Sequence, residues 1–148
     1  MKKVVLALVL VASVIAVSAQ PRALGVRGGY GLELSYQHSL GSNMLQVDAG
    51  LHGFNGLHAV GTYNWLFSIT GGLNWYAGVG AGLGIGGWKD SHLFVGAAGM
   101  VGIEYTFNIP LQLSLDYRPI IGINFGDSKI YGDGFLYGAP GLGIRYKF

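Results

Sequence analysis

The stretch LQLSLDYRPIIGIN, residues 111–124, decides the fold because its apolar and polar residues alternate almost without a break. Leu, Tyr, Pro and Ile fill the odd-numbered positions, and polar groups occupy the even-numbered positions at Gln112, Ser114, Asp116 and Arg118. A helix would scatter these apolar residues around its circumference, whereas a strand places them all on one face. The stretch therefore predicts a β-strand that is apolar on one side and polar on the other.

The same period of two recurs along most of the remaining chain. Its second face is rich in glycine over residues 72–84, where Gly78, Gly80, Gly82 and Gly84 alternate with larger residues. Strands are expected at residues 23–28, 32–39, 44–52, 57–68, 72–84, 93–107, 111–124 and 142–148. Eight strands of roughly ten residues each leave short connections, and an even number is what single-chain bacterial barrels require.

The composition places these strands in a membrane rather than in water. Charged residues make up 11% of the chain and hydrophobic residues 51%, whereas soluble domains carry roughly 25% charged residues. Residues 20–148 contain no unbroken apolar run long enough for a spanning helix, so a membrane segment here has to be a strand. Because a closed barrel leaves no unpaired edge in lipid, we predict an all-β fold, a closed antiparallel up-and-down transmembrane β-barrel of about eight strands.

The alternative fold is a secreted β-sandwich, which also alternates apolar and polar residues. A sandwich would turn Lys, Glu and Thr outward in quantity, but here the second face is mostly Gly, Ala and Ser with a few charges. That composition suits the narrow interior of a closed barrel better than a wet surface. The chain has no cysteine, which excludes disulfides, thiolate metal sites and a catalytic cysteine.

The first residues have the three parts of a secretory signal peptide. Lys2 and Lys3 form a basic start, an apolar run follows them, and small residues lead to a cleavage site near Ala19. The run is shorter than the roughly 20 residues of a spanning helix, which disfavours the alternative of an uncleaved anchor. We expect a signal peptide at residues 1–19 and a barrel domain at residues 20–148. Lys2 and Lys3 account for the whole formal net charge of +2, and no basic cluster is left for binding nucleic acid.

Aromatic residues close several of the expected strands. Similar aromatic patterns end at Phe67, at Phe107 and at Phe148, about 40 residues apart. This spacing corresponds to two consecutive strands and their connections. The aromatic residues therefore fall at the same height along the barrel axis on alternate strands. Since Tyr, Trp and Phe favour a membrane–water interface, we expect a belt on the periplasmic side. Its members are Trp65, Phe67, Trp75, Tyr105, Phe107, Tyr146 and Phe148.

A balanced set of charges falls on the face opposite the apolar one. With the apolar faces toward lipid, the interior is expected to contain Arg27, Glu33, Asp48, Glu104, Asp116, Arg118, Arg145 and Lys147. A buried charge is costly unless it is paired, so this set predicts a network of ion pairs and hydrogen bonds. We expect Arg118 to find its partners among Glu104, Asp48 and Asp116. The alternative is a narrow polar pathway for protons, ions or small solutes.

No pattern in the sequence has the spacing of a catalytic, metal or cofactor site. Residues 82–87 satisfy G-x-G-x-x-G, but a dinucleotide site needs a following helix, and the next residues indicate a loop. Four histidines occur without a local ligand motif or a neighbouring nucleophile and base, at His38, His52, His58 and His92. We therefore expect no enzyme activity and no cofactor.

The C-terminus resembles the assembly signal of outer-membrane β-barrel proteins. That signal carries a glycine before two aromatic or apolar positions and ends in Phe, and Gly143, Tyr146 and Phe148 match it. Residues 20–148 look like the small eight-stranded group that includes the OmpA membrane domain and OmpX. Residues 74–80 and 115–119 are similar to a branch of small outer-membrane proteins with no assigned activity.

The resemblance implies a location in the bacterial outer membrane, with membrane lipid and the barrel-assembly machinery as partners. The resemblance leaves the biological task open, and the role we expect first is a structural one in the envelope, without catalysis. A narrow channel or carrier for small solutes is the first alternative, and a lipid-modifying enzyme is the second. With the aromatic belt on the periplasmic side of the membrane, both termini are expected to be periplasmic. The longer connections near residues 84–92 and 124–134 are then expected on the outer face.

Overall fold

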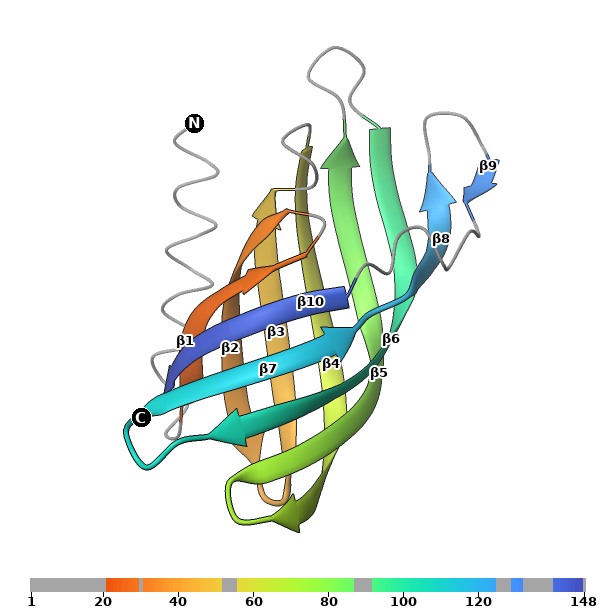
Figure 1. Ribbon diagram of the computed structural model, residues 1–148. Helices are drawn as coiled ribbons and strands as arrows, with labels where there is room; N and C mark the ends of the chain where they lie inside the picture. Colours follow the sequence, from red (N-terminus) through yellow and green to blue (C-terminus); the bar gives the residue numbers. More distant parts are fainter. Residues whose placement is uncertain are drawn as a thin grey trace.

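Figure 1 presents the computed structural model of the chain, in which ten strands belong to one closed sheet. The structure describes residues 21–29, 31–51, 56–86, 92–124, 129–131 and 140–147. The strands are β1 (Pro21–Gly28), β2 (Leu32–Leu40), β3 (Asn43–Leu51), β4 (Gly56–Thr70), β5 (Leu73–Gly86), β6 (His92–Thr106), β7 (Leu111–Tyr117), β8 (Ile120–Asn124), β9 (Lys129–Tyr131) and β10 (Pro140–Lys147). Neighbours follow the order β5-β4-β3-β2-β1-β10-β7-β6-β8-β9, and a further pairing of β5 with β6 closes the ring.

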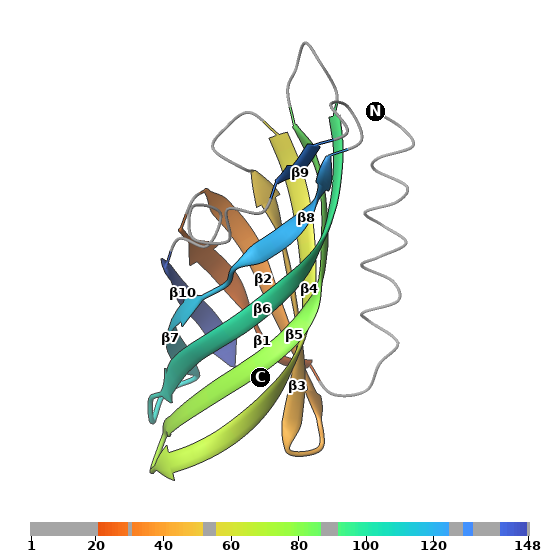
Figure 2. The ribbon, with the colours of Figure 1, turned by 90° about the vertical axis from the view of Figure 1, so that its right-hand side faces the viewer.

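β7 and β8 are two parts of one wall of the barrel. Both pair with β6 in a register that is unchanged between Tyr117 and Ile120, and the amide of Gly99 donates to the carbonyl of Pro119 at 2.9 Å between them. Figure 2 shows β8 continuing the course of β7 along β6. Proline has no amide hydrogen and removes one rung of the ladder, which explains why the strand expected at residues 111–124 is interrupted.

β9 and β10 form the eighth wall in a similar way. β10 pairs with β7 on one edge and with β1 on the other, while β9 pairs with β8. The ten strands therefore make eight walls, which are β1 to β6 singly, β7 with β8, and β9 with β10. Each wall lies beside its neighbours in sequence and every pairing is antiparallel. The predicted closed, antiparallel up-and-down barrel of eight strands is confirmed.

Two tight turns define one end of the barrel, which we call the turn end. Gly41 lies between β2 and β3 and Gly71 between β4 and β5, with φ angles of +65° and +52°. A residue with a Cβ rarely adopts this left-handed conformation, so these turns need glycine. The start of β1 and the end of β10 lie at the turn end too, because Ala23 pairs with both Gln37 and Lys147.

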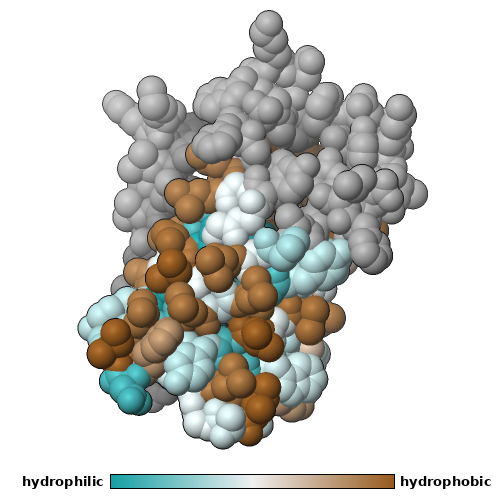
Figure 3. Space-filling model, in the orientation of Figure 1, coloured by the Kyte–Doolittle hydropathy of each residue, from teal (hydrophilic) through white to brown (hydrophobic). Residues whose placement is uncertain are grey.

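Alternation along the strands gives the barrel an apolar exterior and a polar interior. The adjacent residues Leu115 and Asp116 of β7 show the contrast, since 52% of the first and 3% of the second is exposed. Figure 3 shows one face of the barrel on which hydrophobic side chains, in brown, predominate. In the described part of the chain, buried polar residues outnumber buried apolar ones. This arrangement reverses the usual pattern of a water-soluble protein.

The expected strands agree with the structure to within two residues at each end. The one unexpected strand, β9, is too short for its alternation to be recognised in the sequence. The expected signal peptide lies outside the described residues, as do residues 87–91, 125–128 and 132–134 within the two predicted longer connections. The described part of the chain contains no helix with the length and apolar character needed to cross a membrane.

Candidate functional site

Charged and polar side chains fill the interior of the barrel. Of the charged residues predicted to lie there, seven are buried, namely Arg27, Glu33, Asp48, Glu104, Asp116, Arg118 and Arg145. Lys147 is half-buried at the turn end and forms no ion pair with any described residue. Its place as a fourth interior cation is taken by Arg22, which was not among the predicted residues.

Arg22 enters the barrel because β1 begins with a β-bulge. The register of β1 against β2 shifts between Pro21 and Ala23, and a bulge of this kind re-aims a side chain. The Nη1 atom of Arg22 lies 3.1 Å from Oε2 of Glu104 and donates to Oε1 of Gln37 at 2.8 Å. A strict period of two would put Arg22 on the outer face, so alternation alone could not identify it.

Arg118 reaches across the barrel to two carboxylates. Its Nη1 atom lies 2.7 Å from Oδ2 of Asp48, and its Nη2 atom contacts Glu33. The expected pairing with Asp48 is therefore present, whereas the expectation of Glu104 or Asp116 is wrong. Each of those carboxylates pairs instead with an arginine of β1. Alternation predicts which face a residue occupies, but not which side chains meet across the interior.

Arg27 and Glu33 form the centre of a second group of contacts. Arg27 lies opposite Glu33 in the β1–β2 register, with Nη1 and Oε2 2.9 Å apart, and its Nε donates to Oδ1 of Asp116 at 2.9 Å. The hydroxyl of Tyr76 donates to the other oxygen of Asp116 at 3.2 Å. His58 contacts Oε1 of Glu33 through Nε2. This carboxylate partner of His58 comes from a distant part of the sequence and was not predicted.

Neutral side chains connect these ion pairs. The side chain of Gln37 donates to Gln46 at 2.9 Å, and Gln46 donates to Asp48 at 2.8 Å. The hydroxyl of Ser35 donates to Asp48 and accepts a bond from Nε of Arg145 at 2.9 Å. Because Gln37 also binds the bulge arginine of β1, these contacts join the charged groups buried in the described part of the chain into one set, which we call the interior network.

Arg145 is the member of the interior network that contacts no carboxylate of the described residues directly. Only 1% of its surface is exposed, and its hydrogen bonds go to the hydroxyls of Ser35 and Ser114, at 2.9 and 2.6 Å. Its Nη2 atom has no hydrogen-bond partner among the described residues. The charge of Arg145 is therefore compensated through Ser35, which donates onward to Asp48.

The contacts of the interior network cross the ring of strands. Asp48 lies on β3, four walls from the wall of Arg118 in either direction around the ring. Glu104 on β6 lies three walls from Arg22 on β1. An eight-stranded barrel is just wide enough for side chains to fill it. Here the charged side chains fill the part of the interior in which they lie.

Glycines make room for the largest interior side chains. A Cβ at Gly102 would lie 2.7 Å from the ring of Tyr76 and from Cβ of Asp116. A Cβ at Gly78, on the predicted glycine face of β5, would overlap the side chain of Asn64. At these positions the absence of a side chain serves the packing of the interior.

The described members of the aromatic belt lie on the outer surface near the turn end. Phe67 stacks on Trp75 with ring centroids 4.3 Å apart, and Tyr105 meets Phe107 edge to face at 4.8 Å. The exposed aromatic residues of the predicted set are Trp65, Phe67, Trp75, Tyr105, Phe107 and Tyr146. Phe148 lies outside the described residues.

The described histidines lie in different surroundings. His58 points into the interior, whereas Nδ1 of His38 lies 3.1 Å from the hydroxyl of Tyr36. The structure does not describe His52 or the side chain of His92. Among the described residues, no group of three His, Cys, Asp or Glu side chains is placed to hold a metal ion. Residues 82–86 of the glycine motif lie within β5.

No family model matches the chain, and neither the curated proteins nor the solved structures contain a match to it.

Proposed function

We propose that the chain is an integral β-barrel protein of the bacterial outer membrane, with a structural role in the envelope and no catalysis. The observation that carries this proposal is a closed barrel with an apolar exterior and a charged interior. Monomeric proteins in water rarely expose contiguous apolar patches of more than a few hundred Å². The hydrocarbon of a lipid bilayer accommodates such an exterior, provided that every backbone group is paired within the protein.

The dimensions and the aromatic belt support this proposal. The strands β4, β5 and β6 have 15, 14 and 15 residues, and about 9–11 residues suffice for a tilted strand to cross a bilayer. Aromatic side chains gather at one end of the exterior, as they do at a membrane–water interface. The resemblance of the C-terminus, at Gly143 and Tyr146, favours the bacterial outer membrane in particular.

The interior network supports a structural role rather than transport. Three buried arginines, the partly buried Arg22 and four buried carboxylates are joined in one set within the described residues, so the charges compensate one another. Ser35 and Ser114 hydrogen-bond to Arg145 and not to a histidine, so neither is arranged as an activated nucleophile. The charged side chains thus stabilise the barrel through contacts across its interior.

The location is tested by expressing the full chain in a Gram-negative host and separating the inner and outer membranes. The protein is expected in the outer-membrane fraction, and the folded barrel should migrate differently on a gel before and after boiling. Recovery as a soluble periplasmic protein, with the same migration in both samples, would contradict the proposal.

The role is tested by conductance across planar lipid bilayers that contain the purified, folded protein. We expect the conductance to stay at the background of the protein-free bilayer, because the interior network fills the barrel. Reproducible, ion-selective steps would instead favour the alternative of a narrow channel, in which lumen charges set selectivity.

A further inference from the structure

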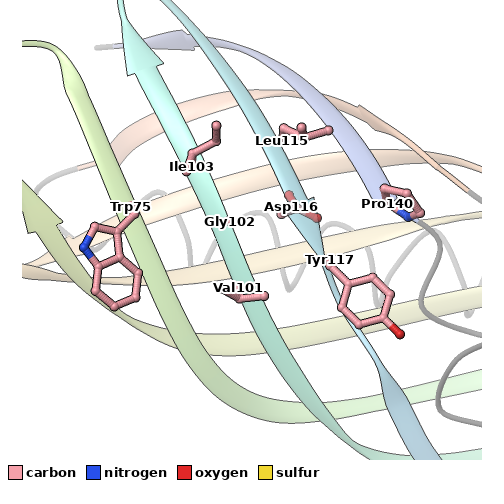
Figure 4. A pocket seen from close by; sticks show the side chains of 8 residues that line it. All are labelled: Trp75, Val101, Gly102, Ile103, Leu115, Asp116, Tyr117 and Pro140. Atoms are coloured by element: carbon pink, nitrogen blue, oxygen red, sulfur yellow. The ribbon is translucent and has the colours of Figure 1, made fainter. Parts of the chain in front are cut away.

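A shallow groove crosses the outer surface of the barrel beside the aromatic belt. Figure 4 shows Trp75 on one side of β6 and Tyr117 and Pro140 on the other, with Val101 and Ile103 between them. The groove has a volume of about 340 Å³, which is near the lower end of the roughly 300–1,000 Å³ range of small-molecule pockets. It is therefore large enough for an extended apolar segment.

The lining of the groove is apolar. Val101, Tyr117 and Pro140 are direct cross-strand neighbours on β6, β7 and β10 and form a row on the outer face. Gly102 and Asp116 contribute only backbone to the floor, since glycine has no side chain and the Asp116 carboxylate is bonded within the interior network. No charged side chain of the described lining points into the groove.

Trp75 forms a fixed wall of the groove. Its indole stacks on the ring of Phe67 with centroids 4.3 Å apart and an interplanar angle of 18°, and the two residues are cross-strand partners on β5 and β4. The contact with Phe67 holds the indole in one orientation, so the wall exists before any ligand binds. A preformed wall reduces the entropy that binding would otherwise cost.

We propose that this groove binds one acyl chain of a phospholipid in the periplasmic leaflet. The proposal rests on the proposed function, in which the exterior faces lipid and the aromatic belt marks the periplasmic interface. The groove begins at Trp75 in that belt and extends away from the turn end toward Tyr117 and Pro140. It thus follows the direction in which a chain descends from its headgroup into the bilayer.

The surroundings of the groove favour a lipid chain over a protein partner. Protein interfaces carry a polar rim around an apolar centre, but the described exposed residues beside this groove include the apolar Val79, Leu142 and Ile144. Bulk lipid also covers the rest of the apolar exterior, so the preference of an acyl chain for this position depends on the shape of the groove. A chain lying in the groove gains dispersion contacts that an unfilled groove loses.

The test measures how strongly a lipid brominated near the top of one acyl chain quenches the fluorescence of single tryptophans in phospholipid vesicles. One protein keeps only Trp75, through Trp65→Phe and Trp88→Phe, and the other keeps only Trp65, through Trp75→Phe and Trp88→Phe. Trp75 and Trp65 are 39% and 43% exposed, so lipid that covers the barrel evenly would quench both alike. With a chain in the groove, a low mole fraction of brominated lipid should quench Trp75 about twofold more strongly, because the chain makes additional dispersion contacts there.

A matched pair of variants separates the groove from its surroundings. Val101→Phe fills the groove and should reduce the quenching of Trp75 to the level of Trp65. Val95→Phe changes a residue of the same strand that is exposed to a similar extent, 45% against 48%, but lies outside the groove, and it should leave the excess unchanged. Equal quenching of the two tryptophans, or excess quenching of Trp75 that persists in Val101→Phe, would contradict the binding of an acyl chain in the groove. Neither result would contradict the placement of the exterior in lipid. Quenching of neither tryptophan would overturn the membrane location as well.

Discussion

The guanidinium of Arg118 and the carboxylate of Asp48 meet across the full width of the barrel, with Nη1 and Oδ2 2.7 Å apart. Arg118 lies between β7 and β8, and β3, which carries Asp48, is the wall farthest from it around the ring. Both residues are buried. The ion pair therefore links opposite walls where little water is available to replace it, and it stabilises the closed form of the barrel.

Loss of Arg118 should destabilise the folded barrel strongly. Arg118→Met leaves Asp48 without its arginine partner and removes one of the two arginine partners of Glu33. Breaking a buried ion pair in this way costs about 3–5 kcal/mol of folding stability. The measurement is urea-induced unfolding of the protein folded in lipid vesicles. Lys147→Met is the control, since Lys147 has no ion pair among the described residues. Equal unfolding midpoints for the two variants would contradict the assignment.

Replacement of Arg145 should cost less than replacement of Arg118. Among the described residues Arg145 bonds only to the hydroxyls of Ser35 and Ser114, so Arg145→Met leaves no described carboxylate without a direct partner. Unpaired hydroxyls cost about 1–3 kcal/mol each at most when buried, and Ser35 keeps its bond to Asp48. Unfolding in the same assay should rank Arg145→Met between the unmodified protein and Arg118→Met. The opposite order would show that Arg145 has a direct anionic partner.

A methyl group at Gly102 should disturb the interior. Its Cβ would lie 2.7 Å from the ring and the hydroxyl oxygen of Tyr76, and overpacking of this kind costs about 1–3 kcal/mol. Gly61→Ala on β4 is the matched control, because a Cβ there meets no atom within 4 Å. Gly102→Ala should lower the unfolding midpoint, whereas Gly61→Ala should leave it unchanged or raise it slightly, since alanine is less flexible in the unfolded chain. Similar effects of the two changes would contradict the packing around Tyr76.

The walls of the barrel could be predicted from the sequence because alternation is a local property. Each outward residue of β7, such as Leu115, is two positions from the next, and this period does not depend on which strands become neighbours. The interruption at Pro119 is also local, since it follows from the missing amide hydrogen. Barrel closure followed from a general requirement, because an apolar sheet in lipid has to pair its edges.

The partners inside the barrel could not be predicted in the same way. Arg22 points inward because of a bulge that shifts its register, and nothing in the alternation marks the bulge. The contacts of Arg118 with Glu33 and Asp48 depend on the register of several strands at once. Counting the charges on each face could therefore indicate an interior with balanced positive and negative charge. Only the closed barrel shows which charged side chains form ion pairs.

The environment of the outward side chains tests the central claim most directly. The chain has no cysteine, so a single substitution such as Leu115→Cys, Val79→Cys or Ile144→Cys provides the only site for a nitroxide spin label. In vesicles, labels at these exposed positions on three walls should collide freely with oxygen, which concentrates in lipid, and rarely with a water-soluble nickel chelate. Ser42→Cys, in the exposed turn between β2 and β3, should show the reverse. Labels at the three wall positions that collide with the nickel chelate as often as the label at the turn would contradict a barrel embedded in lipid.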